Sequence, residues 1–234
     1  MQWDDAIWNN LLTLIAHKKV VPIIGRALSC VQNEAQQAVP LHKLLEQRLA
    51  QALRIDTTTL PSGGSLSELY LACLQPQTRC SIELFHDTVQ QILWDCTPRL
   101  EALLKLAGIT DFSLFVTTAI DGFLVKALQQ ARGTSAIVQD LPFAPNAPCD
   151  LPAEFKTESD IAVYQLFGGH ATCPHWAVSV EHALDFVFAL HNEKSRPYHF
   201  FDFLKSRHVL AIGCQIPDWL GRSFFHCLRG GPLY

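Results

Sequence analysis

The chain has 234 residues, of which 49% are hydrophobic, and a formal net charge of −4. This size and composition allow one substantial apolar core without disulfides or metal, so we expect a single domain, residues 1–234. The Lys and Arg residues are scattered and form no basic stripe, which argues against a nucleic-acid surface but not against a nucleotide ligand.

The N-terminus, Met1-Gln-Trp-Asp-Asp5, carries acidic residues where a signal peptide carries basic ones. No uncharged apolar run approaches the roughly 18 residues of a membrane span. We therefore expect a soluble, cytoplasmic protein that does not bind a membrane. The eight cysteines are widely spaced and form no C-x-x-C pair, so we expect most of them to be buried free thiols and none to bind metal.

Four apolar runs predict strands, and helical patterns lie between most of them. The runs are residues 20–24, 112–116, 161–167 and 209–212, with a weaker candidate at 135–138. Strands that alternate with helices indicate a mostly parallel sheet flanked by helices. We therefore expect a Rossmann-like α/β fold.

Between the first two of these strands, residues 32–108 are mostly helical and too long for an ordinary crossover. We expect part of this interval to form an inserted helical lobe that lies over the sheet and covers a ligand. Two of its apolar helix faces are Leu41, Leu44, Leu45 and Leu49, and Leu84, Phe85, Val89, Ile92 and Leu93.

Each main strand runs into a polar or glycine-containing turn, where ligands of open α/β sheets bind. The first turn is Val21-Pro-Ile-Ile-Gly-Arg-Ala-Leu-Ser29, which has a single glycine and so lacks the G-x-G-x-x-G fingerprint. The second is Thr117-Thr-Ala-Ile-Asp-Gly122, where Asp121 can cap the following helix. The third is Val163-Tyr-Gln-Leu-Phe-Gly-Gly-His170, and the fourth is Leu210-Ala-Ile-Gly-Cys-Gln-Ile-Pro-Asp-Trp219. Each turn alone is ordinary.

Together, in this order over residues 20–228, the four turns resemble the sirtuin-like domains of NAD hydrolases from bacterial antiphage defence. Those domains carry V-P-x-x-G-x-G-x-S, T-T-N-x-D, L-H-G and G-x-x-x-x-D-W, and the match is strongest at residues 117–122 and 213–219. The resemblance implies hydrolysis of NAD to nicotinamide and ADP-ribose in abortive infection, without metal. The four-cysteine zinc module of deacylating sirtuins is absent, which argues against a protein deacylase.

The resemblance also implies site residues. NAD would lie across the carboxyl ends of the strands, with its pyrophosphate near Gly25 and its adenosine end near Gly213. The catalytic positions would be Ala119, Asp121 and His170. The residues implied in NAD binding are Gly25, Arg26, Ser29, Thr117, Thr118, Asp121, Gly168, Gly213 and Cys214.

Three positions depart from the family pattern: Ala119 replaces the catalytic asparagine, Phe167 the histidine before glycine, and Ala27 a second glycine. Because alanine cannot hydrogen-bond through its side chain, we expect catalysis by this sequence to be impaired. Ala119 is either an introduced inactivating substitution or natural, and its intact neighbours favour the substitution. His170, three residues beyond the family histidine, is the candidate base, ahead of His175.

Two other functions stay open, a non-catalytic NAD- or nucleotide-binding regulatory subunit and a purely structural interaction protein. An NAD hydrolase needs control, and the sequence ends at Tyr234, soon after the last predicted helix, residues 217–228, with no predicted sensor. We therefore expect a homo-oligomer, a separate sensor subunit that activates the chain, or both. The expected contact surfaces are the lobe and the last helix.

Overall fold

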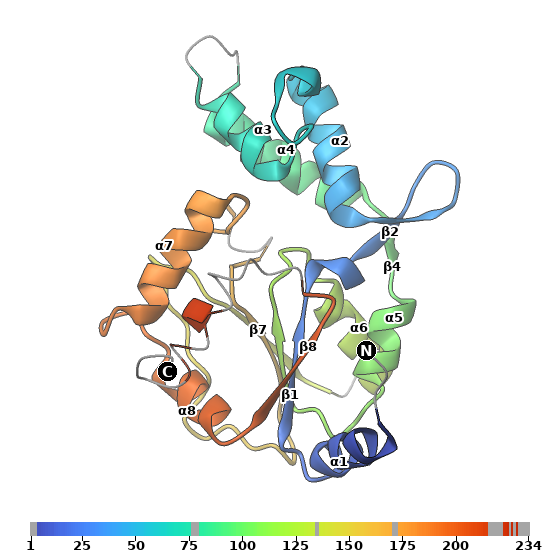
Figure 1. The fold of residues 1–234 in the computed structure, drawn as a ribbon, viewed down its shortest axis with the longest axis vertical. Helices are drawn as coiled ribbons and strands as arrows, with labels where there is room; N and C mark the ends of the chain where they lie inside the picture. Colours follow the sequence, from blue (N-terminus) through green and yellow to red (C-terminus); the bar gives the residue numbers. More distant parts are fainter. Residues whose placement is uncertain are drawn as a thin grey trace.

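The computed structural model describes residues 4–75, 80–133, 136–169, 173–214, 222–224, 226 and 228. Its centre is a five-stranded parallel sheet with the order β6-β7-β5-β1-β8. The strands are β1 (Val20–Ile24), β5 (Leu114–Thr117), β6 (Val138–Pro142), β7 (Ile161–Gln165) and β8 (His208–Ile212). Helices cover both faces of the sheet (Figure 1), which confirms the predicted Rossmann-like α/β fold.

The sheet separates two apolar clusters, and the side chains of β1 alternate between them. Val20 and Ile24 join one cluster, while Val21 and Ile23 join the other. The helices on the first face are α1 (Asp5–Ala16), α5 (Glu101–Ala107) and α6 (Phe123–Arg132), and those on the second are α7 (Val180–His191) and α8 (Tyr198–Lys205). All of β1 is buried, as expected for a parallel strand covered on both faces.

The weak strand predicted at residues 135–138 is wrong in its bounds, because β6 begins at Val138 and residue 135 lies outside the described part. β6 is an edge strand, so it tolerates Pro142, which has no backbone N–H to donate. The four main strands differ from their predicted bounds by two residues or fewer at each end.

Between β1 and β5 the chain leaves the sheet and forms the helical lobe, which we define as α2 (Leu41–Leu53), α3 (Leu66–Cys73) and α4 (Ile82–Asp95) (Figure 1). A small antiparallel sheet joins the lobe to the body, through β2 (Cys30–Gln32), β3 (Ala38–Pro40) and β4 (Pro98–Arg99). The predicted apolar face of α2 is buried. The predicted face of α4 is wrong at Leu84, which is 47% exposed because α4 turns Phe85 and His86 into the core instead.

Side chains of the lobe contact the α7 side of the molecule. Trp176 Nε1 donates a hydrogen bond to His86 Nδ1 at 2.8 Å, and both residues are buried. The rings of Tyr70 and His182 lie 4.5 Å apart between centroids. The backbone N–H of Val180, the first residue of α7, donates to Ser67 Oγ of α3 at 3.1 Å. These contacts hold the lobe over the carboxyl edge of the sheet.

We expect the free energy of unfolding to fall as the pH drops below the ordinary histidine pKa of 6.5. Burial lowers the pKa of both His86 and His182, so the unfolded chain binds more protons in that range and acid favours unfolding. His86 must also stay unprotonated at Nδ1 to accept from Trp176. Urea unfolding on either side of that pH measures the effect. His86→Asn keeps an acceptor there without titrating, so an unchanged pH dependence in this variant would contradict the role of His86.

Two cysteines of the lobe are paired, which the sequence did not predict. Cys73 and Cys80 form a disulfide with their Cα atoms 5.0 Å apart. The other described cysteines are free thiols but only partly buried, so the prediction that most are buried is wrong. Within the described ranges, no group of three or more His, Cys, Asp or Glu side chains could hold a metal ion. No helix in those ranges is long and apolar enough to cross a membrane.

Candidate functional site

A cavity of about 400 Å³ lies at the carboxyl edge of the parallel sheet, under the lobe. Its floor comes from the segments that follow β1, β5 and β7, and its roof and side come from the first turns of α2, α3 and α7. This edge is where open α/β sheets bind ligands, and the volume lies in the range of small-molecule sites. The polar residues that line the floor are Arg26, Ser29, Thr118 and Asp121.

The turn after β1 places Arg26 and Ser29 in the cavity wall, whereas Gly25 lies beneath it. Arg26 opens a short 3₁₀ helix, η1 (Arg26–Leu28), and is exposed, while Ser29 is buried. The N–H groups of Ala27 and Ser29 already donate within the protein, to Gly213 and Arg26 carbonyls. Recognition of an anion at this turn therefore depends on the Arg26 side chain and the Ser29 hydroxyl rather than on those amides.

Gly25 allows the turn after β1 to pack closely against the turn after β8. Its N–H donates to the Ile212 carbonyl at 2.8 Å, and an added Cβ would collide with the backbone of Gly213 and Cys214. The Cys214 thiol donates to the Ile23 carbonyl at 3.3 Å, and burial raises its pKa. Gly213 and Cys214 thus brace the turn after β1, but neither is among the described residues that line the cavity.

The turn after β5 brings Thr118, Ala119 and Asp121 to the cavity. Thr117 is buried below them, where its Oγ1 accepts from the Ala119 N–H at 3.1 Å, and the Thr118 N–H donates to the Ile24 carbonyl at 3.0 Å. Ala119 is only 8% exposed and lines the cavity. An asparagine side chain at this position would project into the cavity from a turn that is already fixed.

Asp121 has the capping role that the sequence suggested and also lines the cavity. Its Oδ1 accepts from the N–H of Phe123, the first residue of α6, at 2.9 Å. Gly122 between them has a φ of +69°, which glycine adopts readily and which lets the carboxylate fold back onto the helix. Asp121 is 7% exposed, so the site contains a largely buried carboxylate.

The turn after β7 contributes an apolar wall. Phe167, at the family histidine position, is buried, lines the cavity and packs edge to face against Phe186 of α7 at 6.1 Å between ring centroids. Gly168 follows with a φ of +73° but is not among the described lining residues. His170 lies outside the described residues. His175 lies near the lobe contact, within electrostatic reach of His86.

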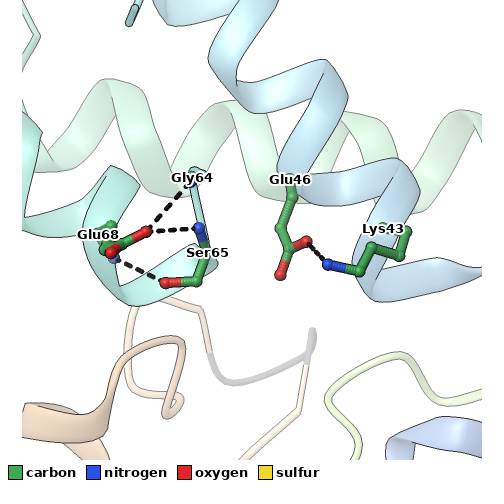
Figure 2. Close-up of polar contacts among 5 residues, drawn as sticks. All are labelled: Lys43, Glu46, Gly64, Ser65 and Glu68. Carbon is green, nitrogen blue, oxygen red and sulfur yellow. Dashed lines mark hydrogen bonds and ion pairs between the residues drawn. The ribbon is translucent and has the colours of Figure 1, made fainter. Parts of the chain in front are cut away.

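The roof of the cavity includes polar residues that the sequence did not single out. Figure 2 shows the Lys43–Glu46 ion pair of α2, with 2.8 Å between Nζ and Oε2, and the capping box of Ser65 and Glu68 at the start of α3. Burial opposes ionisation of Glu68, but backbone N–H groups of the capping loop, including those of Gly64 and Ser65, bond to its carboxylate and hold its pKa below the usual range. Glu46 and Ser65 both line the cavity.

His42, in the first turn of α2, is a second residue that sequence reasoning missed. It lines the cavity, and its Nδ1 is buried without a hydrogen-bond partner among the described residues. No motif surrounds His42 in the sequence, since it follows a short strand and precedes an apolar helix face. The S-x-x-E pattern of Ser65 and Glu68, by contrast, was readable as a capping box.

A larger cavity, about 760 Å³, lies inside the lobe between the end of α2, α3 and α4. Its wall includes Leu53, Leu60, Leu71 and Leu84. It is remote from the ends of the parallel strands and contains none of the turn residues that the sequence singled out. We therefore place the candidate functional site in the smaller cavity.

The comparisons with known proteins do not assign this chain to a family. Neither the protein-family models nor the curated proteins gave a match to the sequence. The functional interpretation consequently depends on the four turns and on the cavity that three of them line.

Proposed function

We propose that this chain binds NAD in the cavity between the lobe and the carboxyl edge of the sheet. We further propose that it is a sirtuin-like NAD hydrolase of antiphage defence, impaired at Ala119 and activated by self-assembly or by a separate sensor subunit. The observation that carries the proposal is the convergence of Arg26, Ser29, Thr118 and Asp121 in one covered cavity.

The charged side chains in this cavity are complementary to two groups of NAD, the pyrophosphate and the ribose that carries nicotinamide. Arg26 can pair with the pyrophosphate, because a guanidinium matches phosphate oxygens geometrically. Breaking the bond between nicotinamide and ribose develops positive charge on the ribose, and the largely buried carboxylate of Asp121 would stabilise that charge. The lobe lies over this cavity, and exclusion of bulk water by it would strengthen both interactions.

A second candidate function is a non-catalytic NAD-binding subunit. Two apolar side chains, Ala119 and Phe167, line the cavity at the positions where the family has catalytic polar groups. A site with these residues can bind NAD and report its presence to a partner without cleaving it. Release of nicotinamide and ADP-ribose distinguishes the hydrolase from this subunit. A structural interaction protein would show neither product release nor an NAD-dependent shift in thermal stability.

Asp121→Ala is expected to weaken NAD binding by more than the loss of a helix cap explains. A lost cap costs about 0.5–2 kcal/mol of folding stability, which would not lower the affinity of the protein that remains folded. Calorimetric titration of the folded variant with NAD measures the difference. Asp121→Asn is the matched control, since its amide oxygen can still accept from Phe123 while the charge is lost. Unchanged NAD affinity in both variants would leave Asp121 as a cap alone.

A further inference from the structure

We propose that His42 of α2 is a catalytic residue, whose imidazole accepts the proton of the water that attacks the ribose of bound NAD. This inference rests on the proposed function and supplies that site with a base from the lobe. The candidate base that the sequence indicated in the turn after β7, His170, lies outside the described residues, and the described part of that turn lines the cavity with Phe167.

The backbone fixes His42 at the edge of the cavity. The N–H of Leu41, the residue before it, donates to the Ser29 carbonyl at 2.8 Å. In the small sheet, Cys30 pairs with Pro40, the neighbours of Ser29 and Leu41, so this bond continues the pairing of β2 with β3. The first turn of α2 is therefore tied directly to the turn after β1. His42 then shares the cavity with Ser29, Arg26 and Asp121.

The state of the His42 ring fits a proton acceptor. Its Nδ1 is buried and lacks a hydrogen-bond partner among the described residues, an arrangement that costs free energy unless a bound water or ligand completes it. His42 also lines the cavity, so a turn of its ring about the Cβ–Cγ bond would bring Nδ1 to a molecule bound there, which would supply that partner. An unprotonated Nδ1 with a free lone pair is the form that a general base requires.

The electrostatic surroundings favour the neutral ring. Burial lowers the pKa of His42, and Arg26 of η1 lowers it further; Glu46 of α2 opposes this shift and Lys43 adds to it. Asp121 is the other charged residue in the described cavity wall, to which α3 and α7 contribute only uncharged side chains. The imidazole is then ready to accept a proton at neutral pH.

The water oxygen forms a bond to the ribose carbon that carried nicotinamide, and the bond from that carbon to the pyridinium nitrogen breaks with its electron pair passing to the nitrogen. Nicotinamide leaves as a neutral molecule. His42 Nδ1 takes one proton from the water and later releases it to solvent, while the other proton remains on the new hydroxyl of ADP-ribose. No oxidant or reductant is consumed.

The kinetic test uses His42→Asn in an Ala119→Asn background, with the activating partner present. The amide of Asn keeps a polar group near the position of Nδ1 but cannot take the proton, so kcat should fall by about 100-fold or more while the Kd for NAD is retained. The loss of kcat as the pH falls below the lowered pKa of His42 should also disappear. His199→Asn is the matched control, because His199 is likewise the second residue of a helix, α8, but is exposed and outside the cavity.

A second readout needs no turnover. In the unchanged chain labelled with ¹⁵N-histidine, the His42 ring signal, assigned by its absence in His42→Asn, should shift when NAD is added. Undiminished kcat in the variant, or NAD binding without any shift of this signal, would overturn the role of His42 and leave the proposed function standing. Failure of both the unchanged chain and Ala119→Asn to bind NAD would overturn both proposals.

Discussion

Ala119→Asn is expected to raise NAD turnover by about 100- to 1,000-fold, the range in which one preorganised polar group contributes to catalysis. Ala119 already lines the cavity, and its backbone N–H is held by Thr117 Oγ1, so the position of the new carboxamide would be fixed by the turn. There it can hold the ribose or the attacking water. The increase in turnover is measured as nicotinamide release. The assay uses the purified chain alone and the chain with a candidate sensor protein encoded beside it.

Ala177→Asn is the matched control for this gain of activity. Ala177 lines the same cavity from the segment before α7, and its backbone N–H is held by the Phe167 carbonyl at 2.9 Å. The same side chain is therefore introduced at another position in the cavity wall, where no increase is expected. If Ala119→Asn binds NAD but gains no turnover with any partner, the chain is a binding subunit rather than an impaired hydrolase.

Gly25→Ala is expected to reduce the free energy of unfolding by about 3 kcal/mol, the upper end of the usual cost of overpacking. The added methyl group would meet backbone atoms of Gly213 and Cys214, which cannot rotate away as a flexible side chain can. Gly25 has a φ of −93°, so alanine suffers no backbone strain and the cost is purely one of close approach. For a chain of this size, the melting temperature should fall by roughly 6–12 °C.

Gly108→Ala controls for the loss of glycine as such. Gly108 also has a negative φ, −68°, and an added Cβ would come no closer than 3.4 Å to a neighbouring atom. Its effect should stay within about 1 kcal/mol and can be stabilising, because alanine restricts the unfolded chain. Equal losses of stability in the two variants would show that the turns after β1 and β8 do not pack as tightly as the structure indicates.

The order of the sheet elements was predictable because parallel strands buried on both faces leave short apolar runs that end in turns. The β1 run is the clearest case, since all five of its residues are buried. Prediction failed at the edge strand β6, which has only partly buried or exposed residues and so no distinct apolar run. Leu84 was wrongly included in the buried face of α4, because periodicity identifies a stripe of apolar residues but not its limits.

Part of the cavity could be anticipated from the sequence and part could not. The turn directly after β5 contains Thr118, Ala119 and Asp121. Their position at the carboxyl edge of the sheet therefore follows from their place in the sequence, next to a predicted strand. His42 and Glu46 reach the same cavity only because the lobe folds back over the sheet, through contacts such as Ser67 with Val180 that join residues 113 positions apart. Tertiary placement of this kind leaves no local pattern in the sequence.

The most direct test of the account is calorimetric titration of the unchanged chain with NAD, alongside Ala119→Phe. Because Ala119 is nearly buried and its side chain lines the cavity, a phenylalanine ring can extend only into the space proposed for the ligand. We expect saturable binding of one NAD per chain and the loss of this binding in the variant. Absence of binding at millimolar NAD, or an unchanged isotherm in a folded Ala119→Phe protein, would contradict the proposed site.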